Sequence, residues 1–267
     1  MPCGLSLQRR ALGSDRTSPV FLIDPKALPS GWSDDSRWLQ WTRRGLRVLF
    51  WSTWSVWLAQ LFSFATGSVL PLVTPKLKQP ALREVAAWAD VGVLVVASGL
   101  VLGAMFLARP PALESTIGRL ESKLAGALRS ALVPLWGAWW TLAVAVVAAQ
   151  RFAFELPLWL AFMPSMLFSG ACALSFGYLS RLASVLGQRT LATIAAIMAV
   201  YAILPLDLET AAYPLVGEPG WKAWLPVMSS GRLAAWMVVF GGALVVSGRL
   251  RRAIEGVDDD LATPNDR

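Results

Sequence analysis

Long runs of apolar residues, separated by short polar connections, recur along most of this chain. A helix needs roughly 20 mainly apolar residues to cross the hydrocarbon core of a bilayer. Six runs approach that length: 48–70, 91–108, 132–149, 156–179, 190–206 and 233–248. The pattern predicts an all-α fold, a polytopic integral membrane protein built as a six-helix transmembrane bundle with short amphipathic interfacial helices.

The segments outside the apolar runs divide the chain into three parts. Residues 1–44 are rich in Ser, Pro and charge and lack the apolar segment of a cleavable signal peptide. We therefore expect them to form a cytoplasmic tail that is largely disordered. Residues 45–250 form the six-span transmembrane domain, and residues 251–267 form a short acidic cytoplasmic tail.

Two connections carry apolar positions at helical spacing together with basic residues. The first precedes the third run, where five residues share one helix face: Leu113, Ile117, Leu120, Leu124 and Leu128. Arg119 and Lys123 lie off that face, so the segment is either a helix that binds lipid or a partner, or a continuation of the third span. The other connection joins the fourth run to the fifth and reads YLSRLASVLGQRTL. In it, Gly187 predicts a helix end, and Arg181 and Arg189 are expected to meet lipid headgroups.

Tryptophans lie near the ends of several predicted spans, where an apolar ring with one N–H donor is stable at headgroup level. Those assigned to the interfaces are Trp51, Trp88, Trp136, Trp159, Trp221 and Trp224. Trp221 and Trp224 belong to the longest outer connection, 207–231. This connection is our first candidate for a ligand site, with a plain interfacial cap as the alternative.

Glycines predict where helices pack closely. Gly92, Gly99 and Gly103 lie in the second run, and the last two form a GxxxG pair; Gly170 and Gly177 lie in the fourth run. Positions without a side chain let two helix backbones approach each other in lipid. We expect these seams to join helices within the chain, although a homo-oligomer or another protein remains possible as the partner. Gln60 is the strongest polar group inside a span, and we expect it to bond a neighbouring helix.

Composition and charge add an orientation. The chain is 55% hydrophobic and 15% charged, with a mean hydropathy of +0.53 and a net charge of +7. Most Lys and Arg residues lie before the first run, in the second and fourth connections, and after the last run. The positive-inside rule then places both termini in the cytoplasm. With no transit peptide visible, we expect a bacterial inner membrane, with the bilayer and not nucleic acid as the partner of the positive charge.

The residue content excludes several chemistries. The chain has no histidine, which removes Ser-His dyads, HExxH zinc sites and His-ligated haem. No Asp or Glu lies in the middle of a run, and there is no glycine-rich phosphate loop. The two cysteines, Cys3 and Cys172, lie in different environments and have no metal-ligand spacing. We expect no cofactor, no metal and no catalytic residue.

The leading functional hypothesis is a non-catalytic subunit, scaffold or anchor of a membrane complex. The alternative is a permease or channel-like component for a neutral or apolar solute that works with a separate ATPase, because six spans with both termini inside suit such permeases. An intramembrane enzyme ranks third, since it would have to act through a Ser, Cys or Tyr such as Cys172 or Tyr201.

Overall fold

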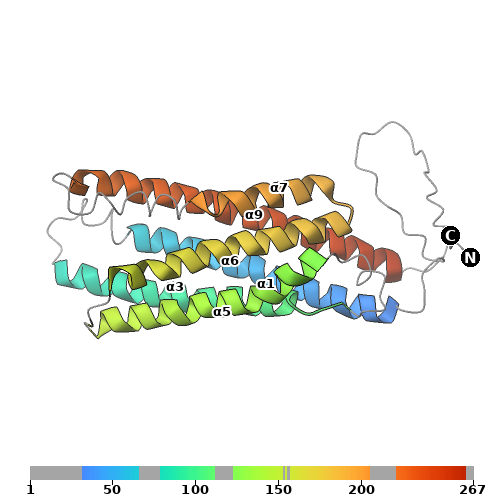
Figure 1. Ribbon diagram of the computed structural model, residues 1–267, viewed down its shortest axis with the longest axis horizontal. Coiled ribbons are helices and arrows are strands. Elements are labelled where there is room, and N and C mark those ends of the chain that lie inside the picture. The colour runs from blue at the N-terminus through green and yellow to red at the C-terminus, as the bar shows by residue number, and fades with distance from the viewer. Residues whose placement is uncertain are drawn as a thin grey trace, which may run out of the picture.

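The described part of the chain is entirely helical. The computed structural model describes residues 32–65, 79–111, 123–152, 154, 157–204 and 221–262. These residues form six helices (Figure 1): α1 (Trp32–Phe64), α3 (Gln79–Leu107), α5 (Lys123–Arg151), α6 (Leu158–Val185), α7 (Arg189–Tyr201) and α9 (Trp221–Ala262). The all-α prediction is confirmed for these ranges.

The helices form a closed ring in chain order. Each helix packs against the next, and α9 returns to pack against α1. Successive helices run in opposite directions, so α1 begins and α9 ends at the same end of the elongated bundle (Figure 1). Inside the ring, Leu46, Leu132, Leu250 and Ile254 are fully buried. The core is therefore one continuous column of apolar side chains.

Three of the described helices contain a segment that is long and apolar enough to cross a membrane. These segments are Lys123–Ala149, Met163–Val185 and Leu233–Glu255, while Val91–Leu107 and Arg189–Tyr201 are apolar but shorter. With 13 residues, α7 extends about 20 Å, less than the roughly 30 Å of a hydrocarbon core. Six helices are thus present in the described ranges, and three of them meet the criteria for a span.

The helices extend beyond the predicted apolar runs. α1 begins at Trp32 and not near residue 45, so the expected tail 1–44 is helical from residue 32; residues 1–31 lie outside the described ranges. α9 continues to Ala262, through most of the predicted tail 251–267. In both extensions one apolar stripe remains buried, through Trp38 and Leu39 in α1 and Ile254 in α9. A count of consecutive apolar residues misses such amphipathic ends.

The other boundaries shift for the same reason. α3 begins at Gln79 and α5 at Lys123, each before the apolar run that predicted it. The amphipathic stripe before the third run is helical and continuous with α5 from Lys123 onward, whereas Arg119 and the rest of 112–122 lie outside the described ranges. Residues 221–231 of the predicted outer connection belong to α9.

Gly187, which predicts a helix end, lies in the turn between α6 and α7. Gly187 has a φ of 73°, in the left-handed region. Its N–H donates to the Ser184 carbonyl at 3.1 Å, and the next N–H, of Gln188, donates to the Ala183 carbonyl at 2.8 Å. This pair of bonds is a Schellman motif, which requires a left-handed residue after the helix. The Ser180 hydroxyl then ties α6 to the Ala192 carbonyl of α7.

Replacing Gly187 with alanine is expected to lower the free energy of unfolding by about 1 kcal/mol, because a Cβ disfavours the left-handed conformation. Chemical unfolding in detergent, followed by tryptophan fluorescence, measures the change. Gly126→Ala is the control: Gly126 lies inside α5 and a Cβ there meets nothing within 4 Å. That variant should not lose stability, and equal losses in both variants would contradict the turn geometry.

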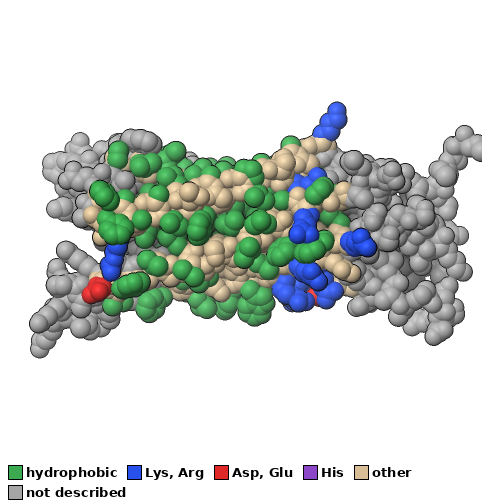
Figure 2. Space-filling view, turned by 90° about the horizontal axis from the view of Figure 1, so that it is seen from below, with side chains coloured by type: hydrophobic (Ala, Val, Ile, Leu, Met, Phe, Trp, Pro, Cys, Tyr) green, Lys and Arg blue, Asp and Glu red, His purple; other side chains and the backbone are tan. Residues whose placement is uncertain are grey.

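The outer surface has an apolar band bounded by charge. Trp51, Val95 and Val200 are 57%, 67% and 73% exposed on the perimeter. Figure 2 shows hydrophobic side chains along the middle of the bundle, with Lys and Arg gathered towards the end where α1 begins and α9 ends. This arrangement is the one that a bilayer requires of a membrane protein.

Candidate functional site

The GxxxG pair of α3 lies against α1. A Cβ added at Gly103 would stand 2.7 Å from Leu49 Cγ, and one added at Gly99 would collide with the Ser52 hydroxyl. From the opposite helix, a Cβ on Gly45 would stand 3.2 Å from the Gly103 carbonyl oxygen. Gly45 and Gly103 therefore let the two backbones approach closely, and Gly45 is a contributor that sequence reasoning missed.

The other predicted packing residues differ in their surroundings. Gly170 and Gly177 of α6 face Leu135 and Leu128 of α5, each with a leucine methyl 3.7 Å from an added Cβ. Gly92 is exposed, and a Cβ there would meet nothing within 4 Å. Gln60 is also exposed on α1. Packing among the described residues thus requires small residues at Gly99 and Gly103 but not at Gly92.

A small cavity lies inside the ring, towards its basic end, because the lining residues Leu49, Leu179 and Ser247 each lie two positions from an arginine. Its volume is about 40 Å³. It is lined by residues of α1, α3, α5, α6 and α9: Leu49, Thr53, Leu100, Trp136, Phe168, Cys172, Ser175, Phe176, Leu179, Val239, Phe240, Ala243 and Ser247. None of these residues carries a charge at neutral pH. The space has room for about three water molecules, far less than a pocket for an organic substrate.

An aromatic cluster forms one side of this cavity. Phe168 of α6 lies at its centre, with ring centroids 4.9 Å from both Trp139 and Trp236, 5.6 Å from Trp136 and 6.2 Å from Phe240. Three of these four pairs are edge-to-face and the fourth is tilted, geometries that suit the aromatic quadrupole. The cluster joins α5, α6 and α9 at one level of the bundle.

The position of Trp136 shows that one of the sequence predictions is wrong. It was assigned to an interface, but it is only 3% exposed and lies halfway along α5. Its indole N–H donates to the Ser175 hydroxyl at 3.0 Å, and that hydroxyl donates to the Ala171 carbonyl at 2.7 Å. A buried indole needs such an acceptor, and α6 supplies it. The residue therefore belongs to the core.

The polar groups around the cavity do not form a catalytic arrangement. The Ser175 and Ser247 hydroxyls both donate to carbonyls of their own helices. Cys172 is a buried free cysteine, as expected of a small packing residue. None of the described residues gathers into a group of His, Cys, Asp and Glu that is able to hold a metal ion. The arrangement offers no nucleophile with an adjacent base.

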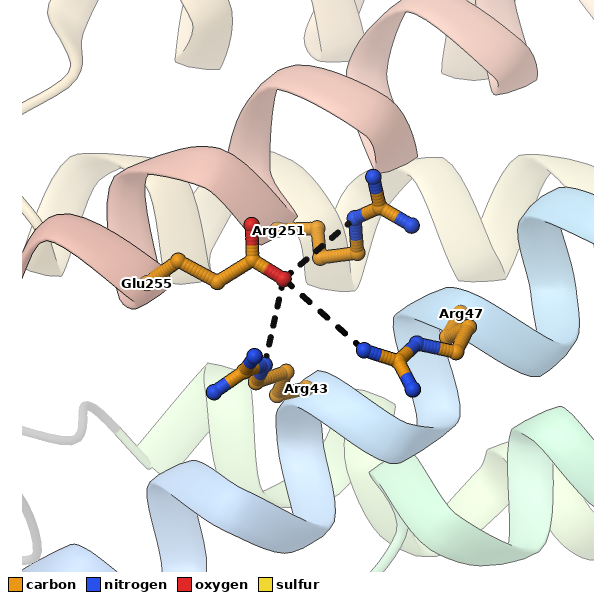
Figure 3. A network of polar contacts seen from close by, with 4 residues as sticks. All are labelled: Arg43, Arg47, Arg251 and Glu255. Carbon is orange, nitrogen blue, oxygen red and sulfur yellow. Dashed lines mark hydrogen bonds and ion pairs between the residues drawn. The ribbon is translucent and has the colours of Figure 1, made fainter. Parts of the chain in front are cut away.

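A cluster of ion pairs among the described residues lies towards the end where α1 begins and α9 ends. Glu255 of α9 is surrounded by three guanidinium groups (Figure 3). Its Oε1 accepts a hydrogen bond from Arg43 Nε at 3.2 Å and lies 3.7 Å from Arg251 Nε and 4.0 Å from Arg47 Nη2. These ion pairs fasten the first described helix to the last.

A second group of contacts fastens the same end of α1 to α3. The Arg109 guanidinium lies 3.6 Å from the ring centroid of Trp41, and the ring of Phe106 stacks on Trp41 at 5.6 Å. The Trp38 indole donates to the Arg109 carbonyl at 3.0 Å. Cation–π contacts of this kind contribute about 0.5–2 kcal/mol. α1 is therefore held on both sides at its basic end.

The predicted basic interfacial residues that the structure describes lie at this end. Lys123, Arg181 and Arg189 are all exposed, at the start of α5, near the end of α6 and at the start of α7. Trp221 and Trp224 lie in the first turns of α9, but their side chains are outside the described set.

Comparison of this chain with known proteins gives no match to a family model, to a curated protein or to a solved structure.

Proposed function

We propose that this chain is a multi-pass inner-membrane protein with six crossings and cytoplasmic termini, and that it serves as a non-catalytic subunit, scaffold or anchor of a membrane complex. The uneven distribution of charge supports the orientation. Among the described side chains, every Lys and Arg except Arg151 lies towards the end where α1 begins and α9 ends. Positive residues favour the cytoplasmic side.

The observation that carries the proposal is the closed ring with its filled interior. Side chains of α5, α6 and α9 meet in the aromatic cluster, and the cavity beside it holds only about 40 Å³. Carriers of ions and protons usually place ionisable groups inside the membrane, and the lining of this cavity has no charged group. The surfaces of the bundle, and not its interior, are therefore available for function.

The alternative is a permease component for a small neutral or apolar solute, energised by a separate ATPase. One observation favours it: the cavity is apolar and lies between the helices of the bundle, where ligand sites of helical proteins often form. This function requires α5, α6 and α9 to separate around the aromatic cluster to admit a solute.

Co-purification with a tag on the C-terminus tests the proposal. Extraction in mild detergent, mass spectrometry and light scattering should reveal a stoichiometric partner, and the partner's share should fall when Arg181 and Arg189 are both changed to Glu. Arg151→Glu, at the opposite end, is the matched control. A stoichiometric ATPase would instead favour the permease, and a monomer that retains no partner would overturn the scaffold.

A further inference from the structure

We propose that the basic seam between α1 and α9 binds the phosphate of an anionic phospholipid of the leaflet that faces this end. The seam consists of Arg43 and Arg47 on α1 and Arg251 and Glu255 on α9 (Figure 3). This inference rests on the membrane insertion proposed above and names the lipid that the basic end recognises.

The arginines of the seam have more hydrogen-bond donors than the Glu255 carboxylate binds. Its carboxylate forms a hydrogen bond with Arg43, but Arg47 Nη2 and Arg251 Nε, at 4.0 and 3.7 Å, lie beyond hydrogen-bond distance. Arg251 Nε is buried and has no hydrogen-bond partner among the described residues. Arg47 is the most open member, with a side chain that is 54% exposed. The Arg251 side chain is still 27% exposed although its Nε is buried, so both guanidinium groups present part of their surface to a second anion.

The floor of the seam is apolar and closely packed. Phe50 lies below the guanidinium of Arg251, with the ring centroid 5.9 Å from Cζ. A Cβ added to Gly248 of α9 would stand 3.4 Å from Phe50 Cε2, so the two helices touch at this level. This close packing therefore prevents an anion from entering deeper than the level of the arginines.

The surface next to the seam fits an acyl chain. Along the outer face of α1, the exposed residues change from basic to aromatic to aliphatic: Arg44, Arg47, Trp51, Trp54 and Leu58. On α9, exposed Val238 and Val245 are followed by exposed Arg249 and Arg252. Both helices change from apolar to basic towards the same end, as lipid headgroups demand.

One ligand chemistry satisfies both halves of this surface. A phosphodiester supplies oxygens to the guanidinium donors, and its acyl chains cover Trp51 and the residues beyond it. Inorganic phosphate fills only the first half, and an acidic peptide leaves the apolar stripe of α1 uncovered. The observations therefore favour a phospholipid over both.

Lipid titration of the full-length, delipidated protein tests the assignment by native mass spectrometry. The probes are phosphatidylglycerol and phosphatidylcholine with identical acyl chains. We expect phosphatidylglycerol to bind more tightly, and Arg47→Gln or Arg251→Gln to weaken its binding about fivefold each, the share of one basic residue near an anionic surface. Phosphatidylcholine binding should not change, and Arg47→Lys should retain most of the affinity.

Arg151→Gln is the matched control, since Arg151 is exposed at the opposite end of the bundle, away from the seam. Its affinity for phosphatidylglycerol should equal that of the unchanged chain. Melting curves without lipid verify that the seam variants fold. An equal loss in the control, equal binding of the two lipids, full competition by millimolar inorganic phosphate at matched ionic strength, or tighter binding of a polyglutamate peptide would each overturn the proposal. Because no partner protein takes part, its failure leaves the scaffold proposal separately testable.

Discussion

Replacing Phe168 with alanine is expected to destabilise the bundle by about 3 kcal/mol, at the lower end of the range for a buried aromatic residue. Phe168 contacts four aromatic rings on α5 and α9, and alanine removes all four contacts and enlarges the adjacent cavity. We expect the lower end of that range because the helices of the unfolded protein stay in lipid. The substitution then removes packing energy, and not the free energy of transfer from water.

Unfolding in mixed micelles with increasing SDS measures this loss through the fluorescence of the tryptophans. Phe152→Ala is the matched control, because Phe152 is 73% exposed. It should change the midpoint little. A similar midpoint shift for both variants would show that the aromatic cluster does not hold the helices together.

Replacing Gly103 with leucine is expected to cost about 3 kcal/mol, at the upper end for an overpacked core. A Cβ at this position already stands 2.7 Å from Leu49 Cγ and 3.3 Å from the Leu49 backbone nitrogen. A side chain can rotate away, but the backbone cannot, so α1 and α3 must separate. The same SDS titration measures the loss.

Gly92→Leu is the matched control on the same helix, because nothing lies within 4 Å of an added Cβ there. We expect its stability to match that of the unchanged chain. The milder Gly103→Ala should be partly rescued by Leu49→Ala, which removes the nearest atoms. If Gly92→Leu were as damaging as Gly103→Leu, the small residues of α3 would serve a contact outside this chain.

The described helices were predictable because an apolar run marks each of them, but their ends were not. Trp38 and Leu39 of α1 are buried, yet Arg37 and Arg43 interrupt the apolar run around them. Whether such a mixed segment continues a helix depends on a neighbour that covers its apolar stripe, and that neighbour lies far away in sequence. A count of consecutive apolar residues therefore sets the boundary too late.

Parts of the candidate sites were visible in the sequence and parts were not. The GxxxG pair indicated a close helix contact, but not that Gly45 of α1 is its counterpart. Trp136 was assigned to an interface because tryptophan has one polar atom; its acceptor, Ser175, lies 39 positions away on another helix. The charge pattern indicated a basic end, whereas the grouping of Arg43 with Glu255 depends on ring closure.

The contact between α1 and α9 also has a consequence for biosynthesis. Glu255 follows its partner Arg43 by 212 positions. At a rate of protein synthesis of about 5–20 residues per second, some 10–40 s pass between the synthesis of Arg43 and that of Glu255. During this interval the face of α1 that later packs against α9 is uncovered, and insertion factors or lipids must shield it. A ribosome that stalls before α9 would leave that side of α1 uncovered and exposed to membrane proteases.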